Sequence, residues 1–327
     1  MECPLCQGRI DEKAFTKSHE SYKFYPCPTC GAGFWWPLSG QSSDIYDLKG
    51  TNSVLGTTQE SYFYRHNEEV LKLDEYHKPF FREGNMPKRP ATLIDVGCAE
   101  GAFLRQAQKY FDVTGIDFDE HSVSVARKAG LSNVYCASLE QFARDNPGKK
   151  FDVVTFFEVL EHQQDPTGFV RGVKGILKDD GMIAGSVPLH MNPEPIALDG
   201  DLPPHHFLIF TKAGLRHFLE KMGFSEIEIS EVFAGEQMRR ASGVNTTLLK
   251  KAFFIKDNET SESSLRFRAY MQARKLARLS LPLVNAVFVP LRMMTKKKDI
   301  EKITEESKAQ FIPMYFQAKR KGGSAGL

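Results

Sequence analysis

The sequence lacks an excess of charge of either sign, because 43 lysine and arginine residues stand against 41 aspartate and glutamate residues in a chain of 327. No strong overall field therefore attracts nucleic acid or an anionic membrane, and nucleic acid is not the expected partner. The sequence also lacks any uninterrupted run approaching about 18 apolar residues, which excludes an ordinary membrane-spanning helix. Its first residues have no charged start followed by an apolar stretch, so we expect a cytoplasmic protein.

The chain does contain 41% hydrophobic residues, enough for one sizeable core with smaller appendages. Its composition changes along its length, with a polar, turn-rich stretch near residue 50 and an amphipathic stretch from Ser61 to Phe81 that predicts a helix. We expect four regions: a four-cysteine module (1–38), a linker with a helical lead-in (39–90), a central domain (91–256), and a polar linker with a basic and apolar helical tail (257–327).

Four of the six cysteines lie within the first thirty residues, as two C-x2-C pairs separated by twenty residues: Cys3, Cys6, Cys27 and Cys30. Two such turns can complete a tetrahedral four-thiolate shell with no open position, so the spacing predicts a structural zinc ion. Two disulfides or unligated core thiols are the alternatives, and a cytosolic setting disfavours disulfides. The nearby aromatic residues 34–36 could touch nucleic acid or pack on the next domain.

From Ala91 onward, strand-like and helix-like apolar patterns alternate. Segments such as ATLIDV and FDVVTFF predict strands, and GAFLRQAQKYF and HSVSVARKAG predict helices, as does a stretch from Thr167 to Gly181. The alternation indicates an α/β fold with a mostly parallel sheet and helices on both faces. Two later strand candidates, 225–233 and 245–255, follow without a clear helix between them and suggest an antiparallel final pair.

The first strand-to-helix turn reads DVGCAEG, and in such sheets ligands bind at this point. The turn has Gly97 and Gly101 but lacks the third glycine of a dinucleotide motif, and Glu100 would repel a pyrophosphate at the helix N-terminus. Asp117, twenty residues after Gly97, ends the second strand, where an acid accepts hydrogen bonds from ribose hydroxyls. An adenosine without phosphates fits this combination, and S-adenosylmethionine is such a molecule.

These motifs, with FDVVTFFEVLEH and HHFLIFTKAGL, make the span from about Ala91 to Ile255 resemble a class I S-adenosylmethionine-dependent methyltransferase with a Rossmann-like sheet. The resemblance places the cofactor's amino-acid end at the glycine turn, its ribose at Asp117, its adenine edge at residues 138–139 and its sulfonium near Glu158. Cys98 inside the turn is more typical of a small buried residue than of a nucleophile. The implied cofactor-binding residues are Asp95, Gly97, Cys98, Ala99, Gly101, Asp117, Phe118, Ser138, Leu139, Phe157 and Glu158.

Methyl transfer is an in-line displacement in which the protein aligns the acceptor and, where needed, removes its proton. A histidine suits that task at neutral pH, and His205 or His206, with His162 behind them, is the expected base. The alternatives are that the first two pack a loop against the helix starting at Thr211, and that Glu161 and His162 steady the segment after the fourth strand. This interpretation requires no catalytic metal.

No N-P-P-Y-like stretch of the kind that grips a nucleobase amino group follows the fourth strand, which favours a small-molecule acceptor. We expect methylation of a hydroxyl or carbon of a sugar or glycan, a quinone-like compound or a lipid-type precursor. A four-cysteine module beside such a domain is similar to some bacterial sugar methyltransferases. The alternatives are a zinc-ribbon RNA methyltransferase and a non-catalytic scaffold that binds S-adenosylmethionine.

The tail segment 265–299 holds an apolar stretch flanked by basic residues and interrupted by Pro282 and Pro290. It is too short to span a bilayer, but it could lie in a membrane interface as a peripheral contact. Packing on the central domain or on a second subunit is the alternative, and the oligomeric state stays open.

Overall fold

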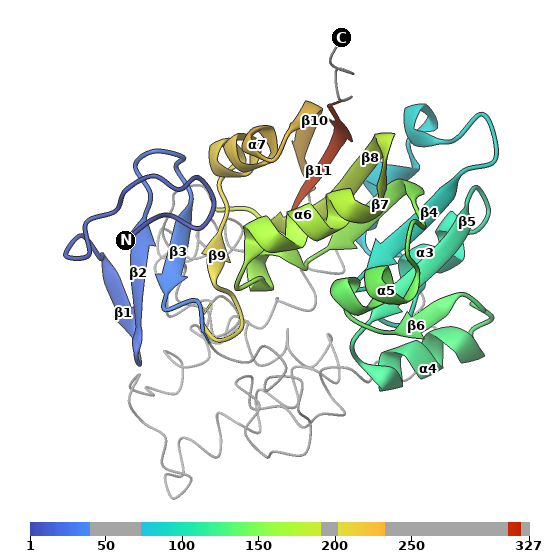
Figure 1. Ribbon diagram of the computed structural model, residues 1–327, viewed down its shortest axis with the longest axis horizontal. Helices are drawn as coiled ribbons and strands as arrows, with labels where there is room; N and C mark the ends of the chain where they lie inside the picture. The colour runs from blue at the N-terminus through green and yellow to red at the C-terminus, as the bar shows by residue number, and fades with distance from the viewer. Residues whose placement is uncertain (40–72, 191–201, 233–312, 322–327) are drawn as a thin grey trace, which may run out of the picture. The chain divides into compact units, whose positions relative to one another are not determined.

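The computed structural model describes residues 1–39, 73–190, 202–232 and 313–321, which form two β-sheets (Figure 1). Most of the linker, the first part of the lead-in helix, the strand candidate 245–255 and the tail segment 265–299 lie outside these residues, and those predictions stay predictions. None of the described helices is long and apolar enough to cross a membrane.

The larger sheet has the strand order β10-β11-β8-β7-β4-β5-β6 within the described residues. The five strands from β4 to β8 pair in parallel, and β11 lies antiparallel between β8 and β10. This confirms the predicted α/β fold with a mostly parallel sheet and an antiparallel last strand. The strands are β4 (Thr92–Val96), β5 (Asp112–Asp117), β6 (Val134–Cys136), β7 (Phe151–Phe157), β8 (Leu177–Pro188), β10 (Phe224–Glu231) and β11 (Pro313–Arg320).

The antiparallel partner of β10 comes from the segment that the sequence assigned to a helical tail. β11, drawn in red in Figure 1, is buried on both faces, with Tyr315 1% and Phe316 0% exposed. The helical prediction is therefore wrong for Pro313–Arg320, and a central domain ending at residue 256 omits a strand of its own sheet. Eight residues so distant from their strand partners carry no local signal of this pairing.

Two other predicted helices differ from the structure. Residues Glu75–Phe81 of the lead-in form the 3-10 helix η2, followed by the short η3 (Glu83–Asn85), because Pro79 cannot donate a backbone hydrogen bond. The helix predicted to run to Gly181 ends earlier, since Leu177 already pairs with Phe151 in the sheet.

Helices cover both faces of the sheet, as the alternation predicted. Apolar side chains of α3 (Ala102–Ala107) and α4 (Glu120–Lys128) belong to one buried cluster. Those of α5 (Leu139–Asp145), α6 (Pro166–Ile176) and α7 (Lys212–Lys221) belong to another. Each cluster holds alternate residues of the same strands, such as Leu93 in the first and Ile94 in the second, because successive side chains of a strand point to opposite faces.

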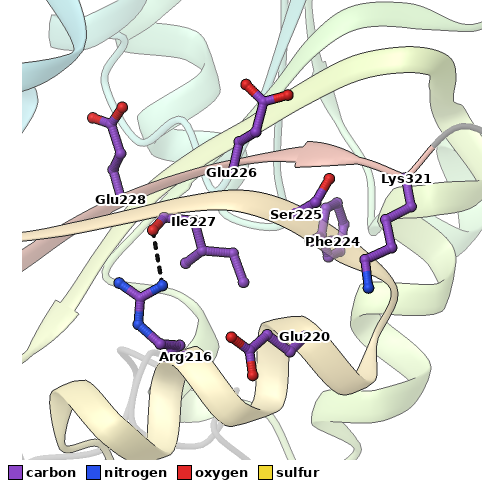
Figure 2. Close-up of a pocket in the computed structure, with 8 residues that line it drawn as sticks. All are labelled: Arg216, Glu220, Phe224, Ser225, Glu226, Ile227, Glu228 and Lys321. Atoms are coloured by element: carbon purple, nitrogen blue, oxygen red, sulfur yellow. Dashed lines mark hydrogen bonds between the residues drawn. The ribbon is translucent and has the colours of Figure 1, made fainter.

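A surface hollow lies between α7 and β10, where Arg216 donates a hydrogen bond over 3.0 Å to the carbonyl of Ile227 (Figure 2). Both carboxylate and cationic side chains line the hollow, so their charges partly cancel. None of the predicted catalytic or cofactor-binding residues lines this hollow.

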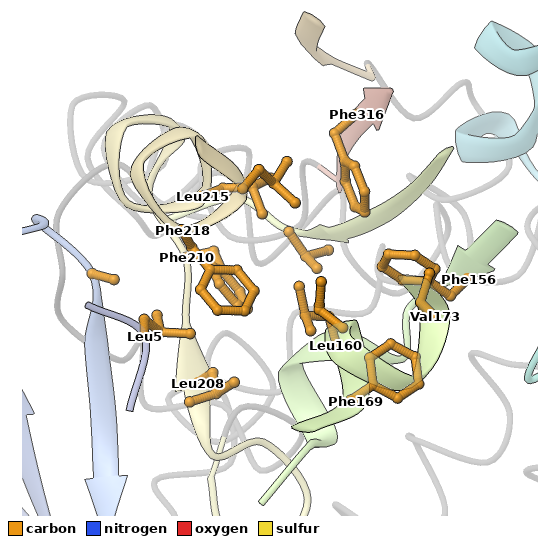
Figure 3. Close-up of a cluster of buried hydrophobic side chains, with 14 of the residues drawn as sticks. Leu5, Phe156, Leu160, Phe169, Val173, Leu208, Phe210, Leu215, Phe218 and Phe316 are labelled. Carbon is orange, nitrogen blue, oxygen red and sulfur yellow. The ribbon is translucent and has the colours of Figure 1, made fainter. Parts of the chain in front are cut away.

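The cysteine module forms the second sheet, in the order β1-β2-β3-β9, and its last strand comes from the central domain. Phe34 of β3 stands opposite Leu208 of β9 in antiparallel register. Leu5 and Leu208 lie in the same apolar cluster as Phe156 of the larger sheet (Figure 3). The module therefore shares a core with the central domain. Its strands are β1 (Lys17–His19), β2 (Tyr22–Pro26), β3 (Gly33–Trp36) and β9 (Leu208–Ile209).

Of the three aromatic residues after the second cysteine pair, Phe34 and Trp35 are buried, with 0% and 1% of their surface exposed, and Trp36 is 41% exposed. The indole of Trp35 packs edge-on against Phe24, with ring centroids 5.3 Å apart. Two of the three aromatic side chains thus pack internally, and only Trp36 presents a large face to solvent.

Candidate active site and four-cysteine centre

The glycine turn after β4 contains backbone conformations that are unfavourable for residues with a side chain. Gly97 and Gly101 have φ angles of +78° and +81°, in the left-handed region that glycine adopts without a steric cost. A Cβ atom on Gly97 would stand 2.7 Å from Cγ2 of Val159, so the turn lies directly against the segment that follows β7. The amides of Gly97 and Cys98 donate to the carbonyl of Ile116 over 2.8 and 3.1 Å, which ties the turn to β5.

Asp117, at the end of β5, holds the other side of this turn. One carboxylate oxygen accepts from the amide of Ala99 over 2.9 Å, and the other accepts from the amide of Asp119 over 2.9 Å. Burial raises the pKa of Asp117, and these two backbone hydrogen bonds oppose the rise. Asp117 is 9% exposed, and the side chain of the next residue, Phe118, is 54% exposed.

Three of the predicted cofactor-binding residues keep their side chains in the interior. Asp95 is 2% exposed and accepts a 2.7 Å hydrogen bond from Thr155, and burial raises its pKa to about 8. Cys98 and Leu139 are each 4% exposed. Ser138 serves as the N-cap of α5, accepting from the amide of Gln141 over 3.2 Å. These side chains shape the sheet edge, and any cofactor contact from Asp95, Cys98 or Leu139 falls mainly to backbone atoms.

Glu158 follows β7 with a φ angle of +53°, an uncommon backbone shape for a residue with a side chain. Its carboxylate accepts a 2.6 Å hydrogen bond from Ser186 of β8, which holds the acid at the sheet edge. Phe157 packs between Phe103 and His77, with ring centroids 4.8 and 4.5 Å away. Sequence patterns did not identify Ser186 and His77, because the residues that they contact come from distant segments.

The structure brings His162, His205 and His206 together. His162 ends the 3-10 helix η4 (Leu160–His162) after β7, and the other two precede β9. Their ring centroids are 4.6 to 4.7 Å apart, and the rings of His205 and His206 are stacked. Burial lowers the pKa of His205 to about 2, and it also lowers the pKa of His162 and of His206. All three imidazoles are therefore neutral at pH 7.

Glu161 and His190 adjoin this group, with 1% and 3% of their surface exposed. A carboxylate oxygen of Glu161 lies 3.6 Å from Nε2 of His162, and its carbonyl accepts a 3.0 Å hydrogen bond from the amide of Phe207. The segment after β7 and the segment before β9 are thus joined through both side chains and backbone. The sequence left Glu161 between steadying this segment and contacting a substrate, and it did not identify His190.

The four N-terminal cysteines converge on one point, with all four Sγ atoms within 4.8 Å of one another. The Cys3–Cys30 and Cys6–Cys27 sulfur pairs are 3.9 and 3.5 Å apart. Four thiolates about 2.3 Å from a tetrahedral zinc ion lie about 3.8 Å from each other, so the cluster fits that ion. The amide of Gly8 also donates to Sγ of Cys6 over 3.3 Å, which stabilises a thiolate.

The centre is attached to the central domain by hydrogen bonds from α6 and α7. Thr211, the N-cap of α7, donates to the carbonyl of Gly31 over 2.8 Å. Thr167 of α6 donates to the carbonyl of Pro4 over 3.2 Å, and Lys221 donates to the carbonyl of Cys6. Both C-x2-C turns therefore contact the same layer of helices.

Comparison with known proteins supports the fold. A family model described as "Methyltransferase domain" matches residues 64–229, which is half of the chain. The chain belongs to this methyltransferase domain family. The match includes the glycine turn, Asp117 and the segment through His162, but it ends before β11.

This methyltransferase-domain chain is similar to ubiquinone biosynthesis O-methyltransferases. It is 30% identical over 170 residues to that of Neisseria meningitidis serogroup C, a match covering 49% of this chain and 59% of the relative. It is 31% identical over 168 residues to that of Pseudomonas paraeruginosa, covering 50% of this chain and 71% of the relative. The match thus spans less than two thirds of the Neisseria protein.

Solved structures of phosphoethanolamine N-methyltransferase 2 from Haemonchus contortus share the fold of this methyltransferase domain. The complex with S-adenosyl-L-methionine has a TM-score of 0.50 at 15% identity, covering 86% of this chain and 60% of that chain. The complex with phosphomonomethylethanolamine and S-adenosylhomocysteine has a TM-score of 0.52 at 14% identity, covering 88% and 62%. At these identities the likeness concerns the fold alone.

Proposed function

We propose that this protein transfers a methyl group from S-adenosylmethionine to a hydroxyl group of a small molecule. The observation that carries the proposal is that three features lie at the same edge of the sheet. The glycine turn follows β4, Asp117 ends β5 and Glu158 follows β7, and these three parallel strands are adjacent. Ligands of such sheets bind at this edge. The group of three histidines begins one turn beyond Glu158, on the side where an acceptor would approach.

The residues at this edge fit a phosphate-free adenosine. Asp117 would accept hydrogen bonds from the ribose hydroxyls, and Phe118 would cover the adenine. The backbone at Gly97, Ala99 and Gly101 would hold the amino-acid end of the cofactor. A pyrophosphate beside the carboxylate of Glu100 would meet a like charge, whereas a positively charged sulfonium compound would not.

The O-methyltransferase names of the relatives support a hydroxyl acceptor over an amine, and carbon methylation is the second candidate. The acceptor classes are a quinone-like compound, a sugar or glycan, and a lipid-type precursor. In the reaction the acceptor oxygen forms a bond to the methyl carbon, the sulfur keeps the electron pair of the broken bond, and the hydroxyl proton is released. His205, His206 and His162 would act on the acceptor side, where that proton must leave.

The four-cysteine centre would hold a structural zinc ion. Burial and the neighbouring thiol of Cys30 raise the pKa of Cys3, and burial raises that of Cys6 to about 11. A bound cation reverses this cost by stabilising the thiolates. Four sulfur ligands leave no position for water or substrate, so this centre would take no part in the chemistry.

Titration calorimetry with S-adenosylmethionine, followed by transfer assays with the labelled cofactor, tests the proposal. We expect saturable one-to-one binding and label transfer to one of three substrate pools: phenolic quinone precursors, sugar nucleotides or extracted lipids. Absence of cofactor binding would contradict the proposal, and cofactor binding without label transfer to any pool would favour the scaffold alternative. Label transfer to RNA, with an affinity that falls steeply with salt, would favour the RNA methyltransferase alternative.

A further inference from the structure

We propose that His162, His205 and His206 form a binding site for a divalent transition-metal ion, separate from the four-cysteine centre. The inference deepens the proposed function, on which its catalytic role rests. It concerns a group of side chains that the sequence treated as bases or as packing residues, and the structure gives that group a different chemistry.

The first argument is geometric convergence. The ligand nitrogens of the three histidines all lie within 4.8 Å of one another. Bonds of about 2.1 Å from a tetrahedral metal ion place such nitrogens about 3.4 Å apart, so small side-chain rotations complete the shell. The ligands come from two segments, η4 and the stretch before β9, that are already joined by the hydrogen bond between Phe207 and Glu161.

The second argument is an unsatisfied polar atom. His205 is 9% exposed, and its Nδ1 atom is buried with no hydrogen-bond partner. A buried polar atom without a partner costs on the order of 1–3 kcal/mol and requires an explanation. A coordinated cation supplies one, because the imidazole lone pair then has a partner.

The third argument is the orientation of His162. Its Nδ1 atom lies 2.7 Å from the carbonyl oxygen of His205 and must donate there, because a carbonyl only accepts. In a neutral ring this leaves the lone pair on Nε2. Histidines that bind metals commonly use this arrangement, in which one nitrogen donates to a carbonyl or carboxylate and the other is the ligand.

A carboxyl group adjoins the three rings. An oxygen of Glu161 lies 3.6 Å from Nε2 of His162, and the Glu161 side chain is 1% exposed. A ligand shell of three imidazole nitrogens and one oxygen suits zinc, iron, cobalt or nickel. Magnesium and calcium prefer shells made of oxygen atoms alone.

Three protein nitrogens leave a position for the acceptor. A hydroxyl bound there would lose its proton more readily, because the cation stabilises the oxyanion. The proton passes to water, the acceptor oxygen forms its bond to the methyl carbon, and the sulfur of the cofactor retains the bonding electrons. The histidines then bind the cation and need not hold the proton themselves.

Metal content of the full-length protein provides the test. Protein stripped with chelator and reloaded with cobalt(II) should bind two equivalents, one with the intense sulfur-to-metal absorption of thiolate ligation and one without it. His205→Ala with His206→Ala should bind one equivalent, with the thiolate band retained. His217→Ala on α7 is the matched control and should bind two. If the double alanine variant fails to fold, His205→Gln takes its place in the test, because glutamine keeps the side-chain volume.

Two equivalents in the histidine variants, or a single equivalent in the unaltered protein, would overturn the metal site. Cofactor binding is measured on the same samples and should be unchanged in the variants. If the unaltered protein does not bind S-adenosylmethionine, the proposed function is overturned, but the metal result still stands. After reloading with cobalt, label transfer should be at least 10-fold lower in the histidine variants than in the unaltered protein.

Discussion

The backbone amide of Trp35 donates a 2.9 Å hydrogen bond to the carbonyl of Phe207, and the amide of Phe207 donates a 3.0 Å hydrogen bond to the carbonyl of Glu161. Phe207 therefore links the cysteine module to the turn after β7, and it directly follows His206 in the chain. The four-cysteine module helps to position the histidines, although its own cysteines are buried away from them in a separate cluster. This arrangement explains why β9 belongs to the module's sheet.

Replacing Cys27 with serine should remove the structural metal and lower the free energy of unfolding by several kcal/mol, since such centres contribute folding free energy directly. Zinc content and urea unfolding measure the two effects. Cys136→Ser, which changes an exposed thiol on β6, is the control and should alter neither. An unchanged unfolding midpoint in Cys27→Ser would show that the centre does not stabilise the fold.

Replacing Asp117 with alanine should weaken S-adenosylmethionine binding at least 10-fold, equivalent to about 1.4 kcal/mol, because the ribose loses its acceptor and the Ala99 amide loses its partner. Calorimetry measures the change. Asp112→Ala alters an exposed acid at the opposite end of β5 and should leave the affinity unchanged. Equal affinities for the two variants would refute the ribose assignment.

Gly97→Ala and Gly148→Ala separate backbone strain from steric conflict, because both glycines have a φ angle of +78°. Nothing lies within 4 Å of a Cβ atom at Gly148, whereas Val159 Cγ2 lies 2.7 Å from one at Gly97. We expect a loss of about 1–2 kcal/mol for Gly148→Ala and about 1–3 kcal/mol more for Gly97→Ala. Thermal unfolding measures both, and adding Val159→Ala should recover part of the larger loss.

Asp152 should make stability depend on pH in the acid range. Burial raises its pKa, but hydrogen bonds from Lys178 and Thr92 outweigh burial and lower the pKa from 3.8 to about 2. The stabilisation, about 2 kcal/mol, is therefore fully present above about pH 4 and is lost as the pH falls towards 2. Asp152→Asn removes it. The stability difference between the two proteins, from urea unfolding, should be constant at pH 5–7 and shrink between about pH 4 and pH 2.

Phe316→Ala should destabilise the protein by roughly 3–5 kcal/mol, because it opens a cavity beneath β11, which lies between β8 and β10. Phe316 packs against Phe156 with ring centroids 5.4 Å apart. Lys319→Ala, which changes a side chain that is 54% exposed on the same strand, should cost less than about 1 kcal/mol. Similar costs for the two variants would mean that β11 is not part of the folded core in solution.

Local patterns in the sequence were enough for much of this protein. The alternation of strands and helices from Ala91, the glycine turn with Asp117, and the cysteine spacing each depend on residues close in the chain. In each case the periodicity of apolar residues or the chemistry of a turn acts over a few positions. These signals therefore predicted the parallel sheet, the glycine turn beside Asp117 and the convergence of the four cysteines.

Tertiary structure alone decided the rest. β11 pairs with β8 and β10 from far along the chain, and eight residues of strand carry no mark of their partners. The sequence named the three histidines as candidate bases, but their convergence beside Glu161 depends on segments that meet only in the folded chain. Folding buries these imidazoles and lowers their pKa values, which makes them weaker bases than exposed histidines. Burial and long-range pairing are properties of the packed chain, and no short stretch of sequence contains them.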